Sequence, residues 1–470
     1  MKPANTIPLI VLSIAFLNAQ TAIPVSAADR TGLEVTIYNQ NLGLVKDTRT
    51  FKLAKGGRVE LLLEEVAPKV QTETVLPVPQ GKGRFTVLEQ NYEYDLLTPR
   101  TLLSKYVGKQ VELLTYDQNN KLVERKKATL LSLNEKAIYQ VGNDIHIEHP
   151  GEVVLPEVPD DLVARPSLRW LAEADKGSHT VQISYLTGGM SWKADYVLKV
   201  NPDKSSADIT GWITLNNESG IAYPDAAVKL VAGTIHRAGP KKRPRREGLQ
   251  LAMRAAPQVR EEAFMDYHLY TIPWSTTIGH KQQKQVELLS QTGIAVEQEY
   301  TVSIVGAAPG RQRSSDPKRP VMTTFNFRNS AANKLGMPLP AGIVRIYSAD
   351  QAGSLQFAGE DRIGHTPRDE PVRLTAGQAF DLVAEMRRTN YQNLGSRDQI
   401  KYEQSTEVAL RNRKPKGSAR IKVYARFNGD WDIQKSNQDF VKEDAFTALF
   451  TVDVPAGKEV KITYTARVEQ

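Results

Sequence analysis

The chain has 470 residues, of which 40% are hydrophobic and 24% are charged, and this composition excludes a disordered chain and predicts two or three globular domains. The 61 lysine and arginine residues exceed the 53 acidic residues by a net charge of +8. No basic face with interleaved aromatic residues stands out, so we predict no nucleic-acid partner. Cysteine is absent, which excludes disulfides, thiol chemistry and a lipid-modified N-terminal cysteine.

The N-terminus has the layout of a secretory signal peptide. Lys2 supplies a positive charge, residues 7–17 form an apolar run, and Val25-Ser26-Ala27-Ala28 offers a small-residue cleavage site, so we predict a leader over residues 1–27. The apolar run is shorter than the roughly 20 residues that cross a bilayer, and no later segment is apolar enough to do so. We therefore expect export to the bacterial periplasm or the cell exterior, with no transmembrane span after leader removal. Retention of the leader as an anchor is the alternative.

Short runs of alternating apolar and polar residues predict a β-rich N-terminal half. Between residues 29 and 103 such runs are separated by turn residues, which is typical of part of a β-sandwich. Residues 104–150 hold four or five shorter runs joined by turn-forming pairs such as Asn119-Asn120 and Gly142-Asn143. This spacing predicts a small SH3-like barrel inserted in the N-terminal half. A proline-rich connector follows it.

The central part, residues 151–235, is organised around the stretch from Tyr185 to Tyr196. A strand runs into this stretch, the pair Gly188-Gly189 lets the backbone turn or bulge, and a second strand runs out of it. Successive side chains of a strand point to opposite faces, so Trp192 and Tyr196 share an apolar face. We therefore predict half-buried strands with Trp192 in the core.

The alternating pattern breaks over residues 236–264, which include the basic run Lys241-Lys-Arg-Pro-Arg-Arg246. One interpretation is a solvated insertion between strands, and the other is a basic finger that contacts anionic lipid or a polymer. Alternation then continues through residues 265–470 and predicts a C-terminal β-sandwich. No amphipathic helix longer than three turns is apparent. The predicted fold class is therefore all-β, built from several antiparallel β-sandwich domains.

Sequence motifs for enzyme chemistry are absent. There is no Gly-x-Ser-x-Gly, no glycine-rich phosphate loop and no His-Glu-x-x-His. The nearest approach to a metal cluster is His146-Ile-Glu-His149, but on a strand His146 and Glu148 share a face while His149 points away. Adjacent carboxylates such as Asp160-Asp161 diverge on an extended chain. We therefore assign no catalytic residue, no metal ligand and no cofactor.

The five tryptophans are the remaining candidates for a binding site. Trp212 lies on the strand face opposite Ile213, where it is either exposed or covered by a second sheet. An exposed tryptophan is a suitable anchor for a sugar or a partner protein. The predicted binding residues are Trp212, Trp274, Trp431, Arg243 and Arg245.

Several segments resemble one family of exported bacterial proteins. They are Arg165-Pro-Ser-Leu-Arg-Trp170, Tyr185-Leu-Thr-Gly-Gly-Met-Ser-Trp-Lys-Ala-Asp-Tyr196, Asn216-Asn-Glu-Ser-Gly220, Leu230-Val-Ala-Gly233, Met337-Pro-Leu-Pro-Ala-Gly-Ile-Val-Arg-Ile-Tyr347, Gly377-Gln-Ala-Phe-Asp381 and Val454-Pro-Ala-Gly457. These segments are similar to the family catalogued as domain of unknown function forty-one thirty-nine, over residues 150–470. Some members carry a coiled coil, for which no heptads are apparent here. The resemblance implies an all-β envelope protein, and it implies no reaction and no catalytic residues.

Three hypotheses for function follow. The first is a non-enzymatic periplasmic or surface protein whose sandwich domains bind an envelope component or another protein. The second is a hydrolase of cell-wall or surface polymer, with its site between the central and C-terminal domains. The third is a scaffold whose small barrel holds a partner peptide. The sequence predicts no oligomeric state.

Overall fold

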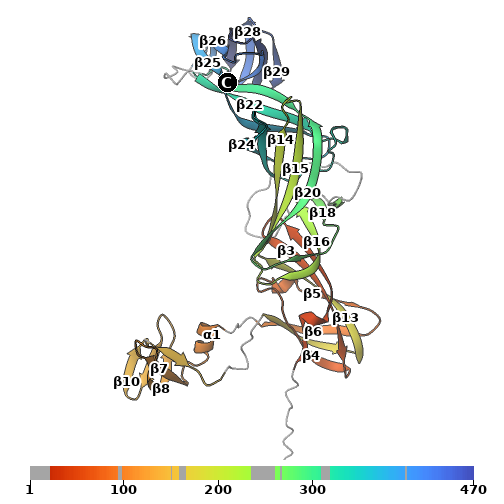
Figure 1. Ribbon diagram of the computed structural model, residues 1–470, viewed down its shortest axis with the longest axis vertical. Coiled ribbons are helices and arrows are strands. Elements are labelled where there is room, and N and C mark those ends of the chain that lie inside the picture. Colours follow the sequence, from red (N-terminus) through yellow and green to blue (C-terminus); the bar gives the residue numbers. More distant parts are fainter. Residues whose placement is uncertain are drawn as a thin grey trace, which may run out of the picture.

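The computed structural model describes residues 22–93, 98–149, 151–157, 166–233, 260–264, 267–308, 318–396 and 400–469. These residues form 31 β-strands, one α-helix of six residues and three short 3-10 helices. The predicted all-β fold class is confirmed. Figure 1 shows an elongated arrangement, with the N-terminal strands towards one end, the C-terminal strands at the other, and a small domain to one side. In the described part of the chain, no helix has the length and apolar character needed to cross a membrane.

Two sheets form the N-terminal sandwich. The larger has the strand order β17-β18-β16-β2-β3-β13-β5, with β19 paired to β16, and the smaller has the order β1-β4-β12-β6. Their strands are β1 (Ile23–Val25), β2 (Arg30–Tyr38), β3 (Leu42–Leu53), β4 (Gly57–Leu63), β5 (Leu76–Gln80), β6 (Phe85–Glu93), β12 (Ser167–Ala174), β13 (Gly177–Gly188), β16 (Tyr223–Ala232), β17 (Arg260–Phe264), β18 (Tyr267–Thr271) and β19 (Thr276–Ile278). Strand β13 pairs with β3 along its whole length. Strands that follow the small domain in the sequence therefore complete the sandwich that precedes it.

The central sheet has the strand order β20-β15-β14-β23-β24. Its strands are β14 (Met190–Val200), β15 (Ser206–Asn217), β20 (Gln282–Ala295), β23 (Gly342–Ala349) and β24 (Leu355–Ile363). The inner face of this sheet shares one hydrophobic core with the N-terminal sandwich. Within that core Trp192 is 5% exposed, packs edge-on against Tyr270, and donates its indole N–H to the carbonyl of Val231 at 3.2 Å.

The C-terminal sandwich is one sheet of nine strands with a core of its own, in the order β28-β31-β26-β25-β22-β21-β27-β30-β29. Its strands are β21 (Glu297–Val305), β22 (Lys318–Arg328), β25 (Pro371–Asn393), β26 (Lys401–Asn412), β27 (Ala419–Arg426), β28 (Asp430–Ser436), β29 (Phe440–Asp444), β30 (Thr447–Val454) and β31 (Glu459–Glu469). The sheet folds over on itself. Its two edge strands come together, and the rings of Phe440 on one and Trp431 on the other lie 6.3 Å apart. Strand β25 passes through both cores, with Leu374 in the first and Leu382 in the second.

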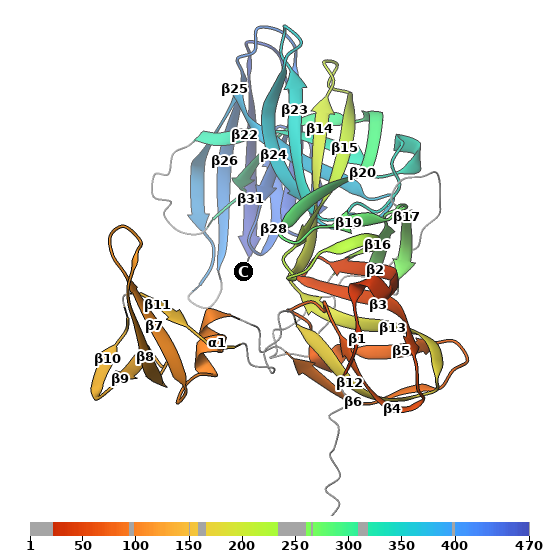
Figure 2. The same cartoon turned by 60° about the horizontal axis from the view of Figure 1, so that its bottom comes forward.

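The small domain stands beside the rest of the chain in both views (Figures 1 and 2). It consists of α1 (Pro99–Ser104), β7 (Gln110–Tyr116), β8 (Leu122–Ser132), β9 (Ile138–Val141), β10 (Asp144–Ile147) and β11 (Glu152–Val154). Its strand order is β10-β9-β8-β7-β11, around a core that includes Tyr106, Leu130 and Tyr139. The pairings do not join β10 to β11, so closure into an SH3-like barrel is not confirmed.

Three buried asparagines stabilise the loops that follow long strands. Asn217 ends β15, Asn329 follows β22, and Asn412 ends β26, and none is more than 1% exposed. The amide nitrogen of Asn217 lies within 3.3 Å of the carbonyl oxygens of Ile221, Ile278 and Gly279. The amides of the other two asparagines donate to loop carbonyls in the same way. These side chains therefore satisfy backbone acceptors that burial would otherwise leave unpaired.

We expect Asn217→Asp to lower the free energy of unfolding by about 2–4 kcal/mol, because a carboxylate would lose the N–H donors and face three carbonyl oxygens. Chemical denaturation at neutral pH measures this change. Asn120→Asp, at an exposed turn of the small domain, is the control and should change stability little. Equal effects of the two substitutions would contradict the proposed role of Asn217.

Strand β1 lies inside the span that the sequence predicts as a leader, whose residues 1–21 are outside the described residues. It pairs parallel with β4, and Val25 is completely buried. The carbonyl of Val25 accepts hydrogen bonds from the guanidinium of Arg49 at 2.7 Å and from the backbone N–H of Glu64 at 3.1 Å. Cleavage after Ala27 would therefore remove a core side chain and the acceptor of a buried guanidinium.

A chain that begins at Ala28 should be less stable than one that begins at Ala22 by about 3–5 kcal/mol, from the lost burial of Val25 and the lost bond to Arg49. Denaturation of the two purified chains measures the difference. Equal stability would show that β1 contributes nothing to the fold. N-terminal sequencing of the protein purified from its own cells reports whether its chain begins before or after β1.

Candidate functional site

The tryptophans predicted as binding residues lie in three different parts of the fold. Trp212 is on β15 of the central sheet and is 37% exposed, and Trp274, between β18 and β19, is 53% exposed. Trp431 on β28 is only 7% exposed, stacks on Phe427 with ring centroids 4.6 Å apart, and donates its indole N–H to the carbonyl of Ala445. Because the nine-stranded sheet folds over it, Trp431 belongs to the core and is not an exposed anchor. Arg243 and Arg245 lie outside the described residues.

The residues of the central motif surround the junction between β13 and β14. Tyr185, Trp192 and Tyr196 have buried side chains. Gly188 ends β13, and Gly189 follows it with φ of +83°, a conformation that favours glycine. These side chains therefore belong to the core, whereas Lys193 and Asp195 of the same stretch point to the other face of the sheet.

The histidines nearest to a metal-binding pattern do not converge. A ring nitrogen of His149 lies 3.0 Å from the carbonyl of Leu114, while Glu148 forms an exposed ion pair with Lys136. His146 lies on β10, at the edge of the small domain's sheet. Among the residues that the structure describes, no group of three histidine, cysteine, aspartate or glutamate side chains could hold a metal ion.

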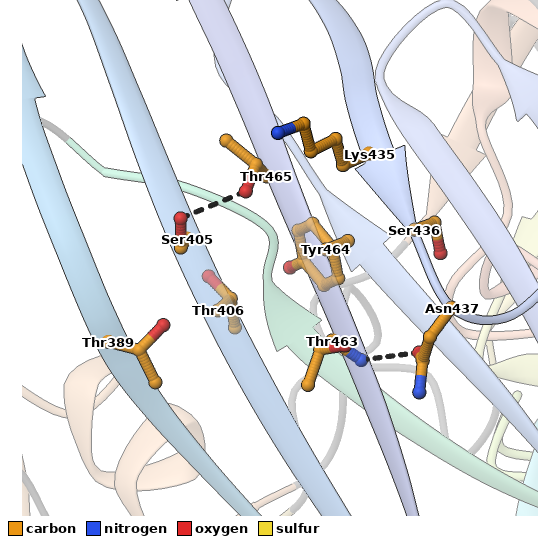
Figure 3. A pocket seen from close by; sticks show the side chains of 9 residues that line it. All are labelled: Thr389, Ser405, Thr406, Lys435, Ser436, Asn437, Thr463, Tyr464 and Thr465. Carbon is orange, nitrogen blue, oxygen red and sulfur yellow. Dashed lines mark hydrogen bonds between the residues drawn. The ribbon is translucent and has the colours of Figure 1, made fainter.

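A pocket of about 350 Å³ opens on the C-terminal sandwich (Figure 3). Its lining consists of Thr389, Ser405, Thr406, Lys435, Ser436, Asn437, Thr463, Tyr464 and Thr465. The hydroxyls of Ser405 and Thr465 bond to each other at 2.9 Å, and burial raises the pKa of Tyr464, whose hydroxyl donates to the carbonyl of Gly306. The lining supplies hydroxyls, one amide and the amine of Lys435 for hydrogen bonding, and it contains no carboxylate and no imidazole.

A second pocket, of about 330 Å³, lies in the small domain. It is lined by Thr98, Pro99, Leu102, Leu103, Val153 and Leu155, from α1, β11 and their flanks. Apart from one threonine hydroxyl, its side chains are apolar. Its lining therefore suits an apolar group rather than a charged one.

The most deeply buried ionic cluster belongs to the N-terminal sandwich. Asp47 accepts hydrogen bonds from Arg30 at 2.9 and 3.0 Å and from Arg49 at 2.8 Å, and Asp47 and Arg49 are at most 2% exposed. Burial opposes ionisation of Asp47, but the hydrogen bonds and charges of the two arginines outweigh it and hold the pKa of the carboxyl below its usual value. A carboxylate held in the charged form is a poor general acid. We therefore interpret this cluster as part of the fold.

The outer face of the central sheet is a described surface where exposed rings lie beside charged groups. We define this outer face by Asp195, Val197, Trp212, Ile343, Arg345, Tyr347, Leu355, Phe357 and Glu360. Register places Trp212 opposite Asp195 and Asp195 opposite Ile343, and it places Tyr347 opposite Phe357. Phe357 and Leu355 are 57% and 51% exposed, and the rings of Tyr347 and Phe357 are 5.6 Å apart. The neighbouring strands β23, β14 and β15 are visible in Figure 2.

Charged side chains on the outer face pair with one another. The guanidinium of Arg345 lies 3.2 Å from the carboxylate of Asp195 and 3.4 Å from that of Glu360. Lys193 also lies 3.2 Å from Asp195. The ion pairs occupy the space between Trp212 and the Tyr347–Phe357 pair. Such a surface can supply ring contacts and hydrogen bonds, but it has no pocket that encloses a reacting bond.

Of the outer-face residues, sequence reasoning selected only Trp212 as a binding residue. Apolar Val344 and Ile346 alternate with Arg345 and Tyr347 in the sequence, which is typical of a strand. In the structure the first two are buried and the other two are half-buried. Nothing in the sequence pattern indicates that β23 joins the sheet that carries Trp212. Strand β23 pairs in parallel with β14, and more than 140 residues separate the two strands. Local alternation shows which side chains share a face of one strand, and it does not show which strands are neighbours.

No protein-family model matches this chain, and no curated protein matches it. The resemblance of residues 150–470 to the family catalogued as domain of unknown function forty-one thirty-nine therefore stays a prediction.

Asp47 should make folding stability depend on pH. Its folded-state pKa lies below the ordinary value of 3.8, so its stabilising effect is present above about pH 4 and is lost as pH falls through the folded-state pKa. We expect Asp47→Asn to cost about 3–5 kcal/mol at pH 7, because the buried Arg49 and the half-buried Arg30 lose their anionic partner, and we expect the difference from wild type to shrink in acid. Denaturation at several pH values, with the exposed Asp439→Asn as control, tests this. A pH-independent difference would contradict it.

Proposed function

We propose that the protein is an exported, non-enzymatic component of the bacterial cell envelope that binds another envelope component. The observation that carries this proposal is the outer face of the central sheet, where exposed rings flank a set of ion pairs on a broad surface. Binding requires complementary surface, and this face has both apolar and polar groups for it. The leader predicted from the sequence supports export.

The alternative of a polymer hydrolase has less support. Hydrolysis of a glycosidic bond needs two carboxyl groups on either side of that bond, one of them with a raised pKa. Neither pocket described above is lined by a carboxylate. Asp47 has a lowered pKa and no contact with a pocket. Among the described residues, each carboxyl group with a clearly shifted pKa has that pKa lowered by hydrogen bonds or ion pairs, whereas a general acid needs a raised one.

The small domain supports a second candidate function, the holding of a partner peptide. Strand β10 is an edge strand of its sheet, and Ile145 and Ile147 on this strand are 66% and 69% exposed. A peptide can add to such an edge as a further strand and cover these side chains.

Co-sedimentation tests the proposed function. The mature protein is mixed with purified cell-wall sacculi and, separately, with outer-membrane fragments across a series of salt concentrations. We expect the protein to pellet with one of them and to remain bound at high salt, because contacts through rings and paired charges are screened far less than contacts through free charges. Loss of pelleting at moderate salt, or none at all, would count against the proposal. A chain that lacks residues 98–157 shows whether the small domain or the rest of the protein provides the contact.

A further inference from the structure

The two ring clusters on the outer face are too far apart for a single small ligand. Trp212 and Tyr347 are two strands and four residues apart in register, which corresponds to roughly 16 Å at the usual spacing of a sheet. One sugar ring or one amino-acid side chain cannot touch both. A ligand that uses Trp212 together with the Tyr347–Phe357 pair is therefore an extended chain that lies across β15, β14, β23 and β24.

The groups between the rings suit the hydroxyls of a sugar chain. Asp195, Arg345 and Glu360 hold one another in place at 3.2 and 3.4 Å, and the carboxylates keep oxygen lone pairs that can accept further hydrogen bonds. A pyranose ring has C–H groups on its faces and hydroxyls around its rim. Its faces can stack on aromatic rings while its hydroxyls bond to carboxylates and guanidinium groups.

Charge on the outer face argues for an uncharged ligand. Lys193 and Arg345 pair with Asp195, Arg345 also pairs with Glu360, and Lys199 pairs with Asp208 beside it. Register also places the exposed Arg362 opposite Ile343 and the exposed Glu287 opposite Trp212, so four cationic and four anionic side chains on and around the outer face cancel. An acidic polymer or an anionic lipid surface would gain no net attraction here.

Backbone pairing argues against an extended peptide. Peptides bind sheets mainly by adding a strand to an edge, where main-chain N–H and C=O groups are unpaired. Strands β15, β14 and β23 are internal to the central sheet, with a neighbour on each side. The outer face thus offers side chains but no main-chain groups along these strands.

We propose that the outer face of the central sheet binds an uncharged, extended, β-linked polysaccharide of the cell envelope. Trp212 stacks on one part of the chain, Tyr347 and Phe357 hold another, and the ion pairs bond to the hydroxyls between them. This inference rests on the proposed envelope-binding function and names the ligand class and the surface that would serve it.

Affinity electrophoresis of the full chain in native gels tests this inference. The gels contain hydroxyethyl cellulose or glycol chitin, both uncharged and β-1,4-linked, and a third gel contains acidic polygalacturonate. We expect at least one neutral polymer to retard the protein, and we expect any electrostatic retardation of this basic chain by polygalacturonate to be unchanged in Trp212→Ala and Phe357→Ala. Trp212→Ala and Phe357→Ala should each weaken retardation about tenfold, the loss expected for a central aromatic contact, and Trp212→Phe should restore part of it.

Two matched controls lie outside the outer face. Phe380→Ala removes a phenylalanine on β25 that is 94% exposed, and Phe446→Ala removes a phenylalanine that is 57% exposed, as Phe357 is. Both should leave retardation unchanged, and thermal unfolding checks that all variants are folded. Failure of both neutral polymers to retard the protein would overturn the inference. Retardation that persists in a Trp212→Ala, Phe357→Ala double variant would overturn it as well.

Comparison with co-sedimentation separates this inference from the proposed function. Pelleting with envelope material that is lost in Trp212→Ala, without retardation by any neutral polymer, would mean that the outer face contacts a protein. That result would support the envelope-binding function and contradict the polysaccharide inference. Retardation by a neutral polymer without pelleting would instead support the ligand class and contradict the envelope as its source.

Discussion

The backbone turn at Gly189 is the constraint on which the arrangement of the sheets depends. Strand β13 belongs to the N-terminal sandwich and β14 to the central sheet, and only this residue separates them. Its φ of +83° and its position, where a Cβ atom would lie 2.6 Å from the carbonyl oxygen of Glu218, leave room for glycine alone. Its N–H donates to the side chain of Asn41, and its carbonyl accepts from the N–H of Glu218 at 2.6 Å. Three loops therefore meet at one residue.

That turn places Trp192 and Tyr196 in the core and leaves their neighbours Asp195 and Val197 on the outer face. The inner side chains pack in one core with the N-terminal sandwich, and β25 runs on from this core into that of the C-terminal sandwich. Buried asparagine side chains donate hydrogen bonds to backbone carbonyls in the loops that follow β15, β22 and β26. The outer face thus lies on β14, β15 and β23, whose opposite faces pack in the core, and on the edge strand β24, which is largely exposed on both faces. Its rings and ion pairs are held in position before a ligand arrives, which lowers the entropy cost of binding.

The buried and surface ion pairs of this protein have different consequences. At Asp47 two arginines hold a carboxylate in the charged form within the sandwich, where it bonds to nothing but its partners. At Asp195 the partners are Lys193 and Arg345, whose side chains are 54% and 36% exposed, so a ligand can reach the groups that hold the carboxylate. Neither arrangement provides a proton donor beside a reacting bond. Both are consistent with a protein that binds without catalysing a reaction.

The sequence by itself determined the all-β class, since residues that alternate with a period of two, as in Trp192 to Val200, form strands with one buried face in whatever sheet they join. It also placed Trp192 on the apolar face of its strand and Trp212 on the face opposite Ile213 of another strand. The tertiary structure decided which strands are neighbours and which tryptophans are covered. Trp431 shows alternation like that of an exposed strand but is covered because the nine-stranded sheet folds over it. Trp212 comes to share a surface with Tyr347 and Phe357 because β23 pairs in parallel with β14. Pairing between distant strands depends on the packing of whole sheets, and alternation within one strand does not predict it.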